Sequence, residues 1–173
     1  MVECHVVPGD VTEVKVDAIA KLIPPPETKE NRQDEVDLAI WKIAGDYYWS
    51  QARKKLASGA KDGEVIVATG GGLSHDGQFR DVIYVNDLYK KRLKDLVYAA
   101  LVAAQARGYK SLAFPVLRKS ELWRLEETLG KIADEIHTGV RRFSVDFDSM
   151  MEITVAAGYD PVALQLLNRF NNH

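Results

Sequence analysis

The sequence predicts a single α/β domain in which a mixed, largely parallel β-sheet carries helices on both faces. Three observations support this fold class. Short apolar runs typical of buried strands alternate with longer stripes of helical period, two strand-like runs follow one another at the start, and 173 residues suffice for one sizeable core. We therefore expect one domain over residues 1–173, with ligands bound beyond the carboxyl ends of the parallel strands.

Six short apolar runs are predicted to form the strands of this sheet. Each is bounded by turn signals such as Pro8-Gly9 or Asp76-Gly77. The predicted strands are Glu3–Val7, Val14–Leu22, Glu64–Thr69, Asp81–Val85, Ser111–Leu117 and Met150–Ala157. Between the second and third strands, Pro24-Pro25-Pro26 and the polar residues up to Gln33 predict a long surface loop.

Five stretches repeat apolar residues with the period of a helix. They are expected from Val36 to about Gly45, from Asp46 as N-cap to about Ser58, from Leu93 to Arg107-Gly108, from Leu122 to Gly139 with Ser120 as cap, and from Asp160-Pro161 through Phe170. Helices and strands thus alternate along most of the chain.

Composition and charge narrow the classes of function. The net charge of -2 provides no general attraction to nucleic acid or to an anionic membrane. Cys4 is the only cysteine, so no disulfide can form within the chain, and no leader or membrane-spanning run is expected. The four histidines show no metal-ligand spacing. These features predict a cytoplasmic protein that needs neither a metal nor a cofactor.

Two neighbouring segments near the start resemble a known family. Gly9-Asp10-Val11-Thr12 followed by Val16-Asp17-Ala18-Ile19 is similar to the opening signature of macro domains, the modules that bind ADP-ribose. Further segments match in the family's order over nearly the whole chain: Val36–Ile40 with Ala44-Gly45, Gly63–Val67, Val82–Val85, Lys110–Pro115 and Tyr159-Asp160. The resemblance implies a three-layer αβα sandwich, with ADP-ribose or a related adenine nucleotide as the ligand.

The resemblance places the adenine end of the ligand on Asp10, Val11 and Tyr159. A carboxylate only accepts hydrogen bonds, so Asp10 suits the adenine amino group, and the Tyr159 ring offers a face on which the base can stack. The alternatives are a turn-stabilising role for Asp10 and a packed sheet-edge role for Tyr159.

At the phosphate end, the chain departs from the family pattern. Lys21-Leu22-Ile23-Pro24 stands where the family has Asn-Ala-Ala-Asn, and Gln33-Asp34-Glu35 replaces a glycine triplet. The second glycine-rich loop of the family is replaced by Val116–Trp123, which contains no glycine. A pyrophosphate would therefore meet the like charges of Asp34 and Glu35 unless these side chains turn away.

Basic residues after the fifth strand offer another way to hold phosphate. We expect Arg118, Lys119 and Ser120 to lie near the phosphate at the head of a helix, with Lys21 as a further candidate. The alternative for the first two is a pair of solvated basic side chains.

Three functions remain open from the sequence. The first is binding of ADP-ribose or a related adenine nucleotide, with weak or no hydrolase activity. The second is a degenerate macro fold that acts as a protein or nucleic-acid interaction module, with the loop from Pro24 to Gln33 as its candidate contact segment. Nucleic acid is the less favoured partner, because the basic patches are accompanied by acidic residues. The third is an ADP-ribose-1''-phosphate phosphatase or de-ADP-ribosylase with rearranged loops.

Overall fold

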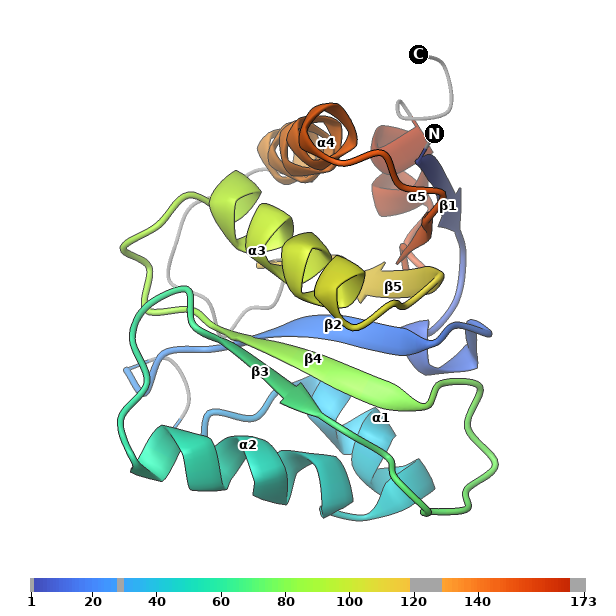
Figure 1. The fold of residues 1–173 in the computed structure, drawn as a ribbon. Coiled ribbons are helices and arrows are strands. Elements are labelled where there is room, and N and C mark those ends of the chain that lie inside the picture. The colour runs from blue at the N-terminus through green and yellow to red at the C-terminus, as the bar shows by residue number, and fades with distance from the viewer. Residues whose placement is uncertain (1, 28–29, 119–128, 169–173) are drawn as a thin grey trace.

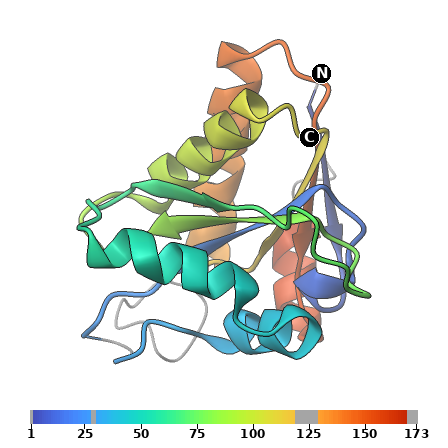
Figure 2. The same cartoon turned by 60° about the horizontal axis from the view of Figure 1, so that its bottom comes forward.

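A six-stranded sheet between two layers of helices forms the centre of the molecule. The computed structural model describes residues 2–27, 30–118 and 129–168 (Figure 1). Figures 1 and 2 show α1 and α2 on one face of the sheet and α3 and α4 on the other. The predicted α/β class, with a mixed sheet covered on both faces, is confirmed.

The strands are β1 (Glu3–Val7), β2 (Ala18–Ile23), β3 (Val65–Ala68), β4 (Asp81–Asn86), β5 (Ser111–Pro115) and β6 (Glu152–Ala156). Their order across the sheet is β1-β6-β5-β2-β4-β3. All neighbours run parallel except β3, which is antiparallel to β4. The carboxyl ends of β1, β6, β5, β2 and β4 therefore lie at the same edge of the sheet, where the connecting loops can build a site.

The helices are α1 (Glu35–Ala44), α2 (Tyr47–Ala57), α3 (Leu93–Ala106), α4 (Leu129–Asp146) and α5 (Pro161–Leu167), with a short 3₁₀ helix η1 at Val11–Glu13. α5 packs on α4 and β1. Among the described residues, no helix combines the length and the apolar content needed to cross a bilayer.

Alternation along β2 divides the core between the two faces. Ala20 and Leu22 pack into the cluster under α3 and α4, whereas Ile19 and Ile23 pack into the cluster under α1 and α2. Because side chains alternate with a period of two, Lys21 falls on the same face as Ile19 and Ile23, toward α1. The sheet thus directs a lysine toward the first turn of a helix.

The start of β2 and the end of α4 differ most from the sequence prediction, whereas β3 to β6 differ at their ends by one or two residues. β2 starts at Ala18 and not at Val14, because the Val14 N–H closes the η1 turn and the Val16 N–H bonds to the carbonyl of Gln78. α4 continues through Gly139 to Asp146. A Cβ at Gly139 would lie 2.7 Å from the Lys94 carbonyl oxygen of α3, so this glycine permits close helix packing and does not end the helix.

The cap of α2 and the loop after β2 match the sequence prediction only in part. Asp46 stands at the N-cap of α2, but its side chain makes no capping hydrogen bond. Pro24 and Pro25 are buried, so the predicted surface loop is exposed only beyond them. The predicted helical contributions of Ser120, Leu122 and Phe170 lie outside the described residues.

Candidate functional site

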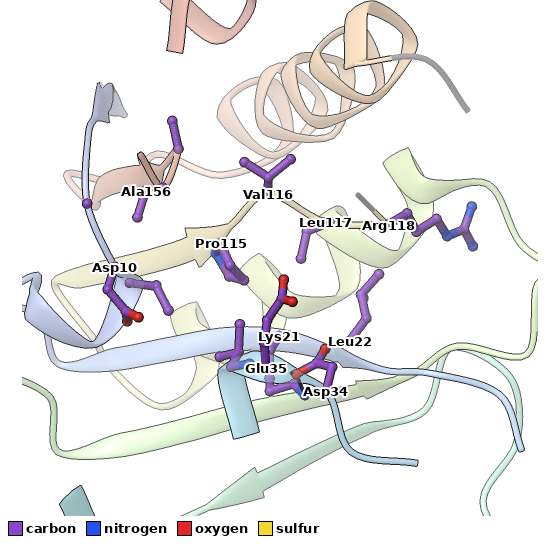
Figure 3. A pocket seen from close by; sticks show the side chains of 15 residues that line it. Asp10, Lys21, Leu22, Asp34, Glu35, Pro115, Val116, Leu117, Arg118 and Ala156 are labelled. Carbon is purple, nitrogen blue, oxygen red and sulfur yellow. Dashed lines mark hydrogen bonds and ion pairs between the residues drawn. The ribbon is translucent and has the colours of Figure 1, made fainter. Parts of the chain in front are cut away.

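A cavity of about 190 Å³ opens at the carboxyl edge of the parallel strands (Figure 3). Loops after three strands and the first turn of α1 form its wall. The lining residues are Gly9–Val11, Lys21-Leu22, Asp34–Val36, Pro115–Arg118 and Ala156–Gly158. This is the edge at which the parallel strands predict a ligand site.

Asp10 lines one end of this cavity and also caps η1. Its Oδ1 accepts hydrogen bonds from the Thr12 N–H at 2.8 Å and from Thr12 Oγ1 at 2.6 Å. Oδ2 has no hydrogen-bond partner among the described residues. The turn-stabilising role and the ligand-binding role are therefore compatible, because each can use a different oxygen. Val11, which follows, is buried and lines the cavity.

A pair of glycines joins the Asp10 turn to the segment that carries Tyr159. The Gly9 N–H donates to the Gly158 carbonyl at 2.8 Å, and the Gly158 N–H donates to the Gly9 carbonyl at 3.0 Å. Both glycines have positive φ, 103° and 72°, which suits residues without a Cβ. Tyr159, one residue beyond this pair, is 79% exposed. Asp10 and Gly158 line the cavity, whereas Tyr159, which follows Gly158 in the chain, is not among the lining residues.

Lys21 is buried beneath the cavity, with 1% of its side chain exposed. Its Nζ lies 2.9 Å from Asp34 Oδ1 and also forms a short ion pair with Asp37. Burial alone would lower the pKa of Lys21, but the charges of Asp37 and Asp34 raise it above its ordinary value. The ammonium group therefore stays charged and is engaged by two carboxylates of the protein.

Asp34 and Asp37 form a reciprocal capping box at the start of α1. Asp34 Oδ1 accepts from the N–H groups of Val36 at 3.0 Å and of Asp37 at 3.2 Å, and Asp37 Oδ2 accepts from the Asp34 N–H at 2.9 Å. Burial acts to raise the pKa of Asp34, but Lys21 and the hydrogen bonds lower it overall. A carboxylate of the protein thus occupies the positive end of this helix.

The second oxygen of Asp37 is a buried polar atom without a partner. Asp37 Oδ1 and the Tyr84 hydroxyl are both buried and have no hydrogen bond among the described residues. Burial raises the pKa of Asp37, Lys21 opposes this, and Asp34 adds to it, so that the pKa reaches about 6. Burial followed by the charges of Asp37 and Asp34 also raises the pKa of Tyr84 well above its ordinary value.

Arg118 borders the cavity, but its side chain points away from it (Figure 3). Its guanidinium forms two 2.8 Å hydrogen bonds with the carboxylate of Asp87 and one of 3.0 Å with the Lys91 carbonyl. The side chain is 3% exposed, and the guanidinium also lies 5.4 Å from the centre of the Tyr89 ring. The predicted contact with phosphate would require this bidentate pair to open.

Lys119 and Ser120 lie outside the described residues. Across residues 2–27, 30–118 and 129–168, no group of three or more His, Cys, Asp or Glu side chains is arranged to hold a metal ion.

Sequence reasoning identified Asp34 and Glu35 as charges at the phosphate end but missed the capping box. The signal was present, because an acidic residue followed three positions later by another, ahead of an apolar helical stripe, is typical of a helix N-terminus. The partnership of Arg118 with Asp87 had no comparable signal, since the two residues are 31 positions apart.

Comparison with solved structures identifies the fold. The macrodomain of Oceanobacillus iheyensis with ADP matches with a TM-score of 0.73 at 17% identity, over 96% of this chain and 88% of that chain. The Trypanosoma brucei macrodomain in complex with ADP-ribose matches with a TM-score of 0.72 at 17% identity, over 96% of this chain and 68% of that chain. This chain therefore has the macrodomain fold.

A second Trypanosoma brucei structure, in complex with ADP, has a TM-score of 0.73 at 17% identity and covers 98% of this chain and 69% of that chain. No family model matches the sequence, and neither does any curated protein. The likeness that these comparisons show is therefore one of three-dimensional structure, and it confirms the macrodomain fold that the matching segments imply.

Proposed function

We propose that the cavity binds ADP-ribose or a related adenine-bearing ligand, with the base held at the end formed by Asp10, Val11 and Tyr159. The observation that carries this proposal is the position of Asp10, which the Gly9–Gly158 pair holds at one end of a cavity in a macrodomain fold, with Tyr159 one residue beyond Gly158 in the chain. The solved neighbours with ADP and ADP-ribose bound support the same ligand class.

The chemistry of the two side chains suits adenine. Asp10 Oδ2 can accept a hydrogen bond from the adenine amino group while Oδ1 keeps η1 capped. Stacking of a base on an aromatic ring contributes about 1–3 kcal/mol in nucleic-acid complexes, and Tyr159 has the exposure that such stacking needs. Together they favour an adenine base over a ligand without an amino group.

Calorimetric titration with ADP-ribose and AMP tests the proposal. Asp10→Asn keeps an Oδ1 that can cap η1 but replaces Oδ2 with an amide that only donates, so we expect the affinity for both ligands to fall about tenfold or more. Asp76→Asn makes the same charge change on an exposed residue of the loop before β4, at the opposite edge of the sheet, and should bind like the wild type. Equal affinities in all three proteins would remove Asp10 from the site.

The contributions of Lys119 and Ser120 are tested separately with Lys119→Ala and Ser120→Ala. If the ADP-ribose affinity of a variant falls severalfold while its adenosine affinity is unchanged, the substituted residue belongs to the phosphate end. If neither affinity changes, that residue plays no part in binding.

An interaction module is the second candidate, and one observation favours it. Leu38 and Trp41, one helical turn apart on α1, are 54% and 56% exposed. For such a module, we expect no nucleotide binding that depends on Asp10. The enzymatic alternative differs from both, because it alone predicts turnover of ADP-ribose-1''-phosphate or of an ADP-ribosylated protein.

A further inference from the structure

The charges around the cavity point to a narrower class of ligand. We propose that the site selects an adenine nucleoside that carries no phosphate, and that the Asp34 carboxylate occupies the position in which an anion would otherwise dock. This inference rests on the proposed function, because it assumes that the base is bound near Asp10.

The start of α1 borders the cavity. A helix of ten residues offers free N–H groups and a positive dipole end to an anion. Here Asp34 Oδ1 accepts hydrogen bonds from the N–H groups of Val36 and Asp37 and from the buried ammonium group of Lys21. A phosphate would have to displace a carboxylate that is fixed by three donors.

The positive charges at the cavity wall are already paired within the protein. Among the described residues that line the cavity, the cationic ones are Lys21 and Arg118. Lys21 is engaged by Asp34 and Asp37, and Arg118 by Asp87, with side-chain exposures of only 1% and 3%. Neither charge is directed into the cavity, so neither offsets the negative charge of a phosphate there.

Two carboxylates with oxygens that no described residue engages also line the cavity. Glu35, in the first turn of α1, is exposed, and Figure 3 shows its side chain rising into the cavity. It has no hydrogen bond or ion pair among the described residues, and Asp10 contributes a further carboxylate at the other end. An anionic ligand would lie between these like charges, whereas an uncharged ribose would not be repelled.

The cavity wall opposite α1 is apolar. Pro115, Val116 and Leu117 line it, and Leu117 is buried. Close approach of a phosphate to backbone N–H groups is hindered by each Cβ, and Pro115 has no N–H to donate. An apolar wall of this kind suits the base and sugar of a nucleoside better than a pyrophosphate.

The test is a charge series on one base: titration of the full chain with 5′-amino-5′-deoxyadenosine, adenosine, AMP and ADP-ribose. We expect the amine and adenosine to bind about tenfold more tightly than the two phosphate-bearing ligands at low salt. The difference should shrink as the salt concentration rises, because added ions screen charges more than about 10 Å apart at 0.1 M and about 3 Å apart at 1 M.

Two variants assign the selectivity to α1. Glu35→Gln removes the charge that faces the cavity, and Asp34→Ser keeps an N-cap hydroxyl while it removes the carboxylate at the helix end and leaves Lys21 paired with Asp37 alone. Each should raise AMP affinity about threefold to tenfold and leave adenosine affinity unchanged. Glu152→Gln, an exposed glutamate at the start of β6 and so at the opposite edge, is the matched control and should change neither affinity.

The outcomes separate this inference from the proposed function. Tighter binding of ADP-ribose than of adenosine, or equal binding of all four ligands, would overturn the phosphate exclusion and leave the adenine site in place. No binding of any of the four would overturn the proposed function itself. If Asp34→Ser does not fold, Glu35→Gln alone decides the point, because the Glu35 side chain is exposed and has no hydrogen bond or ion pair among the described residues.

Discussion

Lys21 shows how a single residue can change the character of a site. A lysine buried in a sheet is costly unless it is paired and hydrogen-bonded. Here the cost is offset by Asp34 and Asp37, which lie 13 and 16 positions further along the chain and reach it through the first turn of α1. The same contacts that stabilise the lysine also occupy the helix end.

The first prediction is that Lys21→Met destabilises the protein by about 3–5 kcal/mol, because it leaves the buried carboxylate of Asp37 and the partly buried one of Asp34 without a counter-charge. Urea unfolding at pH 7 measures this loss. Lys42→Met removes an exposed lysine of α1 and should cost less than about 1 kcal/mol. A Lys21 variant as stable as the Lys42 variant would show that the buried ion pairs do not support the fold.

At the scale of helices, the contact between α3 and α4 depends on a residue without a side chain. A Cβ at Gly139 would meet the Lys94 carbonyl oxygen at 2.7 Å and Val97 at 2.9 Å. Backbone atoms cannot move aside as a flexible side chain can. The two helices therefore approach as closely as they do because position 139 is a glycine.

The second prediction is that Gly139→Ala destabilises the protein by about 1–3 kcal/mol through overpacking. Gly130→Ala, near the start of the same helix, meets no described atom within 4 Å and should be neutral or stabilising by up to about 1 kcal/mol. Thermal unfolding of the two variants measures the contrast. Equal melting temperatures would show that α4 shifts to accommodate the extra methyl group.

Strands and helices were predicted from the sequence where local patterns determine them. β1 has the predicted bounds, and Gly108 follows α3 in a positive-φ conformation as expected of a residue after a helix. The start of β2 and the end of α4 were misplaced because hydrogen bonds to Gln78 and packing on Lys94 decide them. Such long-range contacts leave no trace in a short window of sequence.

The sequence likewise predicts only part of the candidate site. Asp10 and Tyr159 were predicted from matching segments; Asp10 lines the cavity, whereas Tyr159 is exposed and is not among the lining residues. Lys21 and Arg118 were predicted as phosphate ligands because their charge is visible in the sequence, but their partners are not. The electrostatics of the site therefore required the structure.

At the scale of the whole molecule, Asp37 links stability to pH. Its pKa is about 6 in the folded state and about 3.9 in an unfolded chain, so the folded protein binds more protons between these values. Stability from this group is fully present below about pH 3.9 and is lost as the pH rises through 6. The pKa of Asp34 is lowered in the folded state, so the stability that this group contributes is lost as the pH falls.

The third prediction isolates the Asp37 contribution by difference. Asp37→Asn is neutral at every pH, so the stability of the wild type relative to this variant should fall as the pH rises from about 4 to about 6. Chemical unfolding at several pH values measures both proteins. A difference that grows with pH would mean that the attraction of Lys21 outweighs burial and that the folded-state pKa of Asp37 is low.

Whether Asp10 recognises the base is tested most directly by exchanging both partners of the proposed hydrogen bond. Adenosine and inosine differ at the position where adenine donates through an amino group and hypoxanthine accepts through a carbonyl oxygen. Calorimetric titration of wild type and Asp10→Asn with each nucleoside should show wild type favouring adenosine and the variant favouring inosine, each by about tenfold. The same preference in both proteins would contradict an adenine site at Asp10.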